Sequence, residues 1–184
     1  SLDAKIVEQA MKDGHPGVRE NGLMLSEKYP ELIPQLTERT NDSSARVALQ
    51  ATLSLGEFSS AQVVHALASV LEKHGQNPWF RIAVLSSEAG TSLSLLGLLF
   101  NRGVFFKDAK EESTLFVQDF SHIIGARNRE GEIGGLLKML TDADIKKEQG
   151  LQLAGLRGLA SGIEKSGNKI KAEPVLREAL KNIA

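Results

Sequence analysis

Hydrophobic residues recur along most of the chain at the spacing of an amphipathic α-helix. The clearest example begins at residue 61, where Val63, Val64, Leu67 and Leu71 fall at positions i, i+1, i+4 and i+8. This spacing places the four side chains on one face of a helix, where they can be buried against a neighbour. No stretch shows the alternation of apolar and polar residues that is typical of a half-buried strand. The pattern therefore predicts an all-α fold.

The same periodicity, interrupted by turns rich in glycine, proline and polar residues, predicts ten or eleven short helices. Gly75 is expected to close the helix that contains Leu71, and the helix that contains Phe116 and Phe120 is expected to end near Gly125. The apolar stretches that define the predicted helices are residues 3–12, 16–28, 32–40, 45–55, 61–74, 78–89, 91–101, 115–125, 133–140, 150–163 and 173–183.

One combination of residues recurs at the start of three predicted helices. Asn77 can cap a helix with its side chain, Pro78 suits the first helical position, and Arg81 stands four residues after the cap. Two upstream sites also place a polar residue four positions before an arginine. Three copies in register indicate repeated helix pairs. The upstream copies comprise His15, Pro16 and Arg19, and then Asp42 and Arg46.

Two roles are open for Arg19, Arg46 and Arg81. In a stack of repeats, equivalent arginines can form a ladder with the Asp or Asn caps of neighbouring repeats, while their apolar stems cover the core. The alternative is a row of arginines that binds an anion. The first role is structural and the second functional, and the sequence is compatible with both.

Short helices that are paired and repeated are typical of an α-solenoid. One helix pair cannot bury its apolar face alone, so neighbouring pairs stack into a continuous core. We expect a right-handed superhelix of about five HEAT-like helix pairs, forming a single domain over residues 1–184. The chain begins with Ser1 rather than methionine, so we expect it to be a fragment of a larger multidomain protein.

Four interior glycines mark one predicted helix near the end of the chain. An interior glycine destabilises a helix by about 1 kcal/mol relative to alanine. Four of them in one helix therefore indicate that another backbone packs very close to it. The four are Gly150, Gly155, Gly158 and Gly162.

Composition excludes several function classes. The formal net charge of −1 argues against general binding to nucleic-acid phosphates. The absence of cysteine excludes disulfides, thiolate nucleophiles and cysteine zinc sites within the chain. No apolar run approaches the length of a membrane-spanning helix, so direct membrane insertion is not expected.

Histidines and carboxylates give no catalytic or metal-binding pattern. His15, His65, His74 and His122 include no pair at i, i+4 spacing on one helix. Paired carboxylates fall in turns or at helix starts, without an apolar pocket that would raise a pKa. We therefore expect no catalytic residue, no metal ligand and no cofactor in this chain.

The three sites that combine a polar cap residue with an arginine four positions later resemble HEAT-type helical repeats. The resemblance rests on the Asp or Asn cap, on the pairs Val18-Arg19, Ala45-Arg46 and Phe80-Arg81, and on the Ala/Leu-rich helix after each pair. The copies at His15 and Asn77 are more narrowly similar to the HEAT-like region of large planctomycete and verrucomicrobial proteins. Those proteins are described as membrane-bound dehydrogenases, with a β-propeller before the repeats and a haem-binding cytochrome c segment after them. The resemblance implies an extracytoplasmic parent protein with this chain as its spacer or scaffold.

The expected function is that of a non-catalytic scaffold for protein–protein or interdomain interaction. A solenoid binds its partner along the concave surface, which is lined by the second helix of each pair. The partner is expected to be a protein, either another domain of the parent chain or a separate molecule. The alternative is an enzyme built on helical repeats, of the bilin-lyase type. Candidate interaction residues are Gln35, Arg39, Gln62, His65, Ser69, Glu72, Trp79 and Lys138.

Two aromatic features have two interpretations each. Trp79 suits either a binding hot spot or a half-buried wedge between repeats. Phe105 and Phe106, in the connection between residues 103 and 112, suit either an exposed binding element or docking into the core. Because large apolar side chains are mostly buried, docking is the expectation for the phenylalanines.

Overall fold

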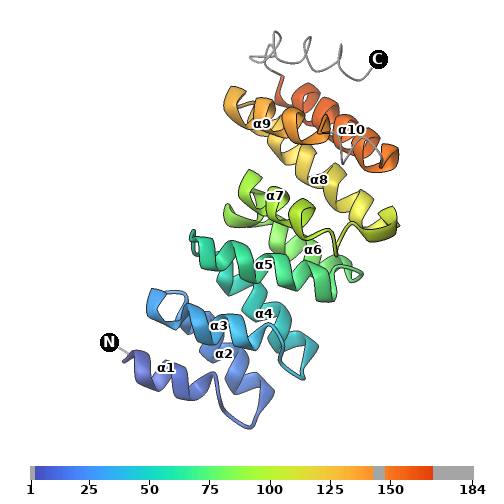
Figure 1. The fold of residues 1–184 in the computed structure, drawn as a ribbon. Coiled ribbons are helices and arrows are strands. Elements are labelled where there is room, and N and C mark those ends of the chain that lie inside the picture. Colours follow the sequence, from blue (N-terminus) through green and yellow to red (C-terminus); the bar gives the residue numbers. More distant parts are fainter. Residues whose placement is uncertain (1–2, 143–147, 168–184) are drawn as a thin grey trace. The chain divides into compact units, whose positions relative to one another are not determined.

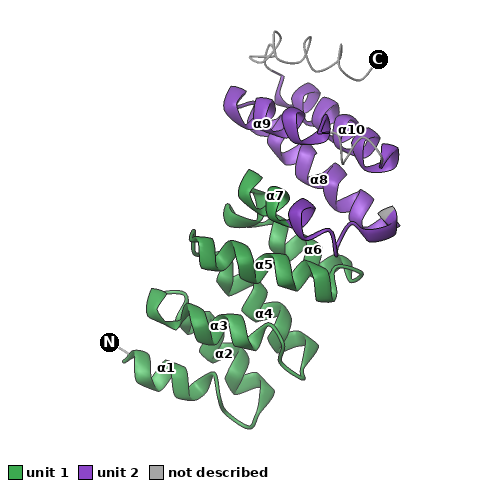
Figure 2. Ribbon diagram, viewed as in Figure 1, with its two compact units in different colours: residues 1–98 green, residues 99–184 purple. Residues whose placement is uncertain are grey.

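The computed structural model describes residues 3–142 and 148–167, and these residues form ten α-helices and three short 3₁₀ helices (Figure 1). No strand occurs within the described ranges, so the all-α prediction is confirmed. The chain divides into two compact units, residues 1–98 and residues 99–184, with the boundary inside helix α7 (Leu93–Arg102) (Figure 2). The single domain over residues 1–184 stays a prediction.

In unit 1, packing between helices follows their order along the chain. Helix α2 contacts α4, and α4 contacts α6, which makes one row; α3 contacts α5 in a second row (Figure 1). Fully buried leucines from both rows fill the core between them. The elements of this unit are α1 (Ala4–Ala10), α2 (Pro16–Ser26), η1 (Pro30–Leu32), α3 (Ile33–Arg39), α4 (Ala45–Leu55), α5 (Ala61–His74), α6 (Pro78–Leu85), η2 (Ala89–Thr91) and the beginning of α7.

Side-chain bonds set the direction of neighbouring helices in the first row. Arg46 on α4 binds Glu20 on α2, with Nε 2.7 Å from the nearer carboxylate oxygen. About two turns further along both helices, the Ser54 hydroxyl donates to Glu27 Oε1 at 2.8 Å. The N-terminal part of α4 thus binds the N-terminal part of α2, and the C-terminal part of α4 binds the C-terminal end of α2. The two helices therefore run in the same direction. The second helix of each pair returns the chain to the starting end.

Unit 2 contains a pair of long helices in very close contact. Its elements are the end of α7, η3 (Lys107–Ala109), α8 (Glu111–Arg127), α9 (Glu130–Leu140) and α10 (Gln149–Ser166). A Cβ added to Gly158 would overlap the carbonyl oxygen of Gln118, and one added to Gly162 would overlap that of His122. Residues further along α10 contact residues further along α8, so the two helices are parallel. Their backbones are in direct contact at these glycines.

The predicted close approach is therefore confirmed for Gly158 and Gly162. Gly155 lies instead against the side chain of Leu140, and nothing lies within 4 Å of a Cβ built on Gly150. At these two positions the prediction of a neighbouring backbone was wrong. Gly150 lies in the first turn of α10 and is exposed.

The helix predicted to end near Gly125 ends two residues later, so Gly125 itself lies inside it. Helix α8 continues to Arg127 and ends at Asn128, which has a left-handed φ of 49°. The physical reason is that Gly125 faces the backbone of Leu159 and Ile163 on α10, so its missing side chain serves packing rather than termination. The predicted helix over residues 173–183 lies outside the described residues.

The connection after α7 docks into the core of unit 2. Phe105 and Phe106 are buried, which confirms docking over an exposed binding element. The Phe106 ring stacks on Phe100 with centroids 4.4 Å apart, and Phe105 meets Phe116 edge to face at 5.5 Å. Phe116 also neighbours Phe120 at 6.1 Å. These aromatic pairs fix the connection onto α8.

Replacing Gly158 or Gly162 with alanine should destabilise the protein, because the new methyl group has no space between α8 and α10. Overpacking a tight contact typically costs about 1–3 kcal/mol. Denaturant unfolding followed by circular dichroism measures the change.

Gly150→Ala on the same helix is the matched control, and we expect it to leave stability unchanged or slightly higher, because the site is open and alanine favours helix. Equal stability of all three variants would contradict the backbone contact.

Candidate functional site

A short hydrogen bond recurs at the three sites that combine a polar residue with an arginine. At each of them a side chain accepts a hydrogen bond from the backbone N–H two residues later. The distances are 3.2 Å for His15 Nδ1, 2.9 Å for Asp42 Oδ1 and 3.0 Å for Asn77 Oδ1. His15 and Asn77 are the N-caps of α2 and α6, which begin at Pro16 and Pro78, so there the bond satisfies a backbone donor that the helix leaves without an internal partner. The N-cap of α4 is Ser44, so the prediction that Asp42 caps this helix was wrong, and its bond closes a turn before the helix.

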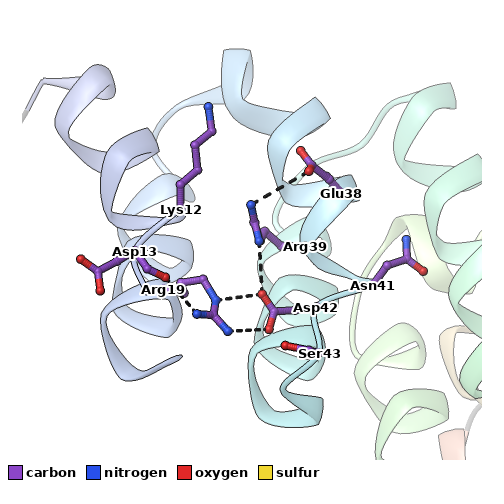
Figure 3. Close-up of a pocket in the computed structure, with 8 residues that line it drawn as sticks. All are labelled: Lys12, Asp13, Arg19, Glu38, Arg39, Asn41, Asp42 and Ser43. Carbon is purple, nitrogen blue, oxygen red and sulfur yellow. Dashed lines mark hydrogen bonds and ion pairs between the residues drawn. The ribbon is translucent and has the colours of Figure 1, made fainter. Parts of the chain in front are cut away.

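Arg19 joins three segments of unit 1 (Figure 3). Its Nε and Nη2 donate to the two carboxylate oxygens of Asp42 at 2.9 and 2.8 Å. Its Nη1 donates to the backbone carbonyls of Asp13 and Gly14 at 2.9 and 3.1 Å. The guanidinium therefore links the turn before its own helix to the turn before α4, the next helix of the first row. A bidentate pair of this kind is both strong and geometrically specific.

The other two arginines repeat parts of this arrangement. Arg81 Nη1 donates to the carbonyls of Gly75 and Gln76 at 2.7 and 3.3 Å, which is the same offset that Arg19 uses for its own turn. Arg46 binds Glu20 on the preceding first-row helix, and its side chain is 79% exposed. All three arginines thus bind groups of the protein itself, as the structural role requires.

The carboxylate of Asp42 is held ionised by its partners. Its side chain is only 2% exposed, and this burial would by itself raise its pKa. Hydrogen bonds from Arg19, from the Ser44 N–H and from Arg39 act in the opposite direction and keep the pKa of Asp42 below its ordinary value. A carboxylate bound in this way is a weak base and is poorly suited to general acid–base catalysis.

An open pocket of about 440 Å³ lies beside this ion pair (Figure 3). Cationic and anionic side chains are equally represented in its lining, and the buried pair Arg19 and Asp42 is neutral as a unit. Arg39 contacts Asp42 Oδ2 at 3.4 Å and Glu38 Oε1 at 4.0 Å, which are long, weak contacts. The lining residues are Lys12, Asp13, Arg19, Glu38, Arg39, Asn41, Asp42 and Ser43.

The residues expected to form an interaction surface fall on several elements. Gln35 and Arg39 lie on α3, and both are engaged within the protein: the Gln35 amide donates to Glu8 at 3.3 Å, and Arg39 lines the pocket. Trp79 lies on α6 in the other row of unit 1, and Lys138 lies on α9 of unit 2. The residues on α5 are Gln62, His65 and Ser69, which are exposed, and Glu72, which is half-buried.

Exposed apolar side chains gather on the first-row helices α2, α4 and α6. Trp79 is 65% exposed, so the interpretation as a half-buried wedge is wrong, and Ile82 one turn later is 57% exposed. The sequence prediction placed the interaction surface on the second helix of each pair, and of these side chains it included only Trp79. The further members are Val18, Met24, Leu25 and Leu53.

The described residues contain neither a metal-binding cluster nor a membrane-spanning helix. Among residues 3–142 and 148–167, no group of three or more His, Asp or Glu side chains is placed to hold a metal ion. In the same part of the chain, no helix has the length and apolar character needed to cross a membrane. In comparisons with protein-family models, curated proteins and solved structures, nothing matches this chain.

Arg19→Lys should lower the melting temperature by about 5–10 °C. Lysine keeps the charge but cannot bind Asp42 through two parallel N–H groups and reach the Asp13 carbonyl at the same time. Differential scanning calorimetry measures the shift.

Arg46→Lys is the control: it makes the same substitution at an exposed arginine of α4, whose pair with Glu20 contributes little. A melting temperature within about 2 °C of the parent is expected there. Equal shifts in the two variants would contradict the special role of Arg19.

Asp42→Asn should reduce the sensitivity of the protein to acid. The folded-state pKa of Asp42 is lowered from 3.8, so its ionised form stabilises the fold above that pH and the contribution disappears as pH falls through the lowered pKa. Urea unfolding at pH 6 and at pH 3 measures the difference.

The variant should have a lower free energy of unfolding than the parent at pH 6, and the difference between the two should be smaller at pH 3. Glu38→Gln in the same pocket is the control, because its side chain is 70% exposed. If this difference in the free energy of unfolding is the same at both pH values, the Asp42 carboxylate is not stabilised in its ionised form in the folded protein.

Proposed function

We propose that the chain is a non-catalytic scaffold for protein–protein or interdomain interaction, built as an α-solenoid of HEAT-like helix pairs. The observation that carries the proposal is the serial packing in unit 1, where α2, α4 and α6 contact one another in order and α3 contacts α5. A fold in which each helix pair touches its neighbours in chain order is the basis of a solenoid.

Unit 2 supports the same interpretation through its own helices. Helix α9 lies in the chain between α8 and α10, which are parallel and in close contact. This is the relation that α2 and α4 have in unit 1, with α3 between them. One arrangement of first, second and next first helix thus occurs in both units, which favours a common repeat.

The proposed binding surface is the exposed side of α5. Gln62, His65 and Ser69 stand at positions i, i+3 and i+7 and are exposed to solvent, while α5 buries its opposite face through Val63, Leu67 and other apolar residues. Such a row of amide, imidazole and hydroxyl groups can donate and accept hydrogen bonds along a protein partner. We refer to Gln62, His65 and Ser69 together as the α5 row.

The resemblance to HEAT-like regions of dehydrogenase and cytochrome c proteins extends this proposal to the parent chain. On that basis, the parent protein is extracytoplasmic, and this part is the spacer that holds a catalytic and a haem-binding domain in register. The partner of the α5 row is then either one of those domains or a separate protein.

Site-specific photo-crosslinking in the native cells tests the scaffold function. A photoreactive phenylalanine analogue is placed at position 65 or 69 of the full-length parent protein. Control positions are 53 and 82, which are exposed on the first-row helices α4 and α6.

We expect a protein adduct, within the parent chain or to a separate protein, at positions 65 and 69 and not at the controls. Absence of protein adducts at all four positions would contradict the scaffold, and so would an absorbance change when the purified chain is mixed with a bilin.

A further inference from the structure

His74 lies where three helices of unit 1 meet. It is the last residue of α5, and its ring stacks on Phe80 of α6 with centroids 4.5 Å apart and an interplanar angle of 17°. The ring also forms a hydrogen bond with the backbone of Thr40, the residue that caps the C-terminus of α3. The neighbouring Lys73 binds Asn41 Oδ1 at 2.6 Å. The end of α5 thus holds both the α3 terminus and the start of α6.

The bonding of the imidazole defines which nitrogen carries its proton. The bond to Thr40 favours the protonated ring, so the acceptor is the carbonyl oxygen and the ring is the donor. Nε2 is buried and has no hydrogen-bond partner. The donor is therefore Nδ1, and Nε2 carries a lone pair that faces no donor. A second proton would place an unpaired N–H in a buried position, which is unfavourable.

The helices that pack near the end of α5 carry several titratable groups. Helix α5 itself carries His65, Glu72 and Lys73; α3 carries Glu38 and Arg39; α4 carries Arg46 and α6 carries Arg81, while η2 carries none. Burial is the largest cause that lowers the pKa of His74, and the charge of Lys73 lowers it further, while the Thr40 bond opposes both. None of the carboxylates is a bonded partner of the ring that would stabilise a positive charge on it.

The lowered pKa gives the direction of the pH dependence. The neutral ring is favoured in the folded protein, so its contribution to stability is fully present above the ordinary histidine pKa of 6.5. As pH falls below that value, the unfolded chain takes up the proton more readily than the folded chain. The fold is therefore weakened on mild acidification, in a range where carboxylates remain ionised.

We propose that His74 is an acid-sensitive latch: protonation at Nε2 expels the ring from its place between Thr40 and Phe80 and loosens the end of α5 from α3 and α6. Because Lys73 and Arg81 bind on either side of this point, the loosening is centred on the α3–α5–α6 junction. The proposed binding row lies on α5 as well, but the latch does not depend on that function.

Thermal unfolding of the whole chain at pH 7.5 and pH 5.5 tests the latch, with the single tryptophan, Trp79, as a fluorescent probe next to Phe80. The parent protein should lose about 5 °C in its melting temperature on acidification. His74→Phe keeps an aromatic ring against Phe80 but cannot take up a proton, and we expect it to lose less than half as much. His65→Gln on the exposed face of the same helix is the matched control and should behave like the parent.

A His74→Phe variant that loses as much as the parent would overturn the proposal. The titration of the His74 ring in the parent protein, followed by NMR, gives a second test that does not require a folded variant. A midpoint below 6.5 supports the latch, and a midpoint at or above 6.5 overturns it.

Discussion

The bond between Arg19 and Asp42 is the interaction on which the N-terminal unit most depends. Four of the five N–H groups of the guanidinium have defined acceptors: two carboxylate oxygens and two backbone carbonyls. The carbonyls belong to the turn before α2, and the carboxylate belongs to the turn before α4, the following first-row helix. Removing either partner would leave a poorly solvated charge without compensation, so breaking this pair should be strongly destabilising.

Arg19 binds both a carboxylate and the carbonyls of its own turn, whereas Arg46 and Arg81 each make only one of these two kinds of bond within the described part of the chain. Among the described residues, Arg81 binds the carbonyls of its own turn and no carboxylate, while Arg46 binds a carboxylate but remains exposed. The hydrogen bond from the N–H two residues later occurs at His15, Asp42 and Asn77, so it is more constant than the arginine bonds. The three sites therefore share this local bond, and the link between neighbouring first-row helices differs from one pair to the next.

The sequence predicted the helices well because each has a buried face wide enough to define its period. It predicted less at positions where one residue type serves two purposes. A helix was expected to end near Gly125, yet this glycine makes room for the α10 backbone, and no local pattern distinguishes these roles. Trp79 and Ile82 lie on an eight-residue helix, α6, which is too short for its spacing to separate the buried from the exposed face. The caps at His15 and Asn77 could be predicted from the sequence, whereas α4 begins after Ser44 rather than at Asp42. The two carbonyls bound by Arg19 depend on the path of a turn.

The central claim is that stability in this chain is carried by contacts between neighbours in series. Hydrogen exchange followed by mass spectrometry on Asp42→Ala tests it most directly, because exchange reports the opening of each helix separately. The account predicts faster exchange in α2, α4 and the adjoining α1 and α3, with exchange in α8 and α10 unchanged. Equal acceleration across all the helices would contradict it, since the chain would then unfold as one cooperative body rather than as a series of neighbours.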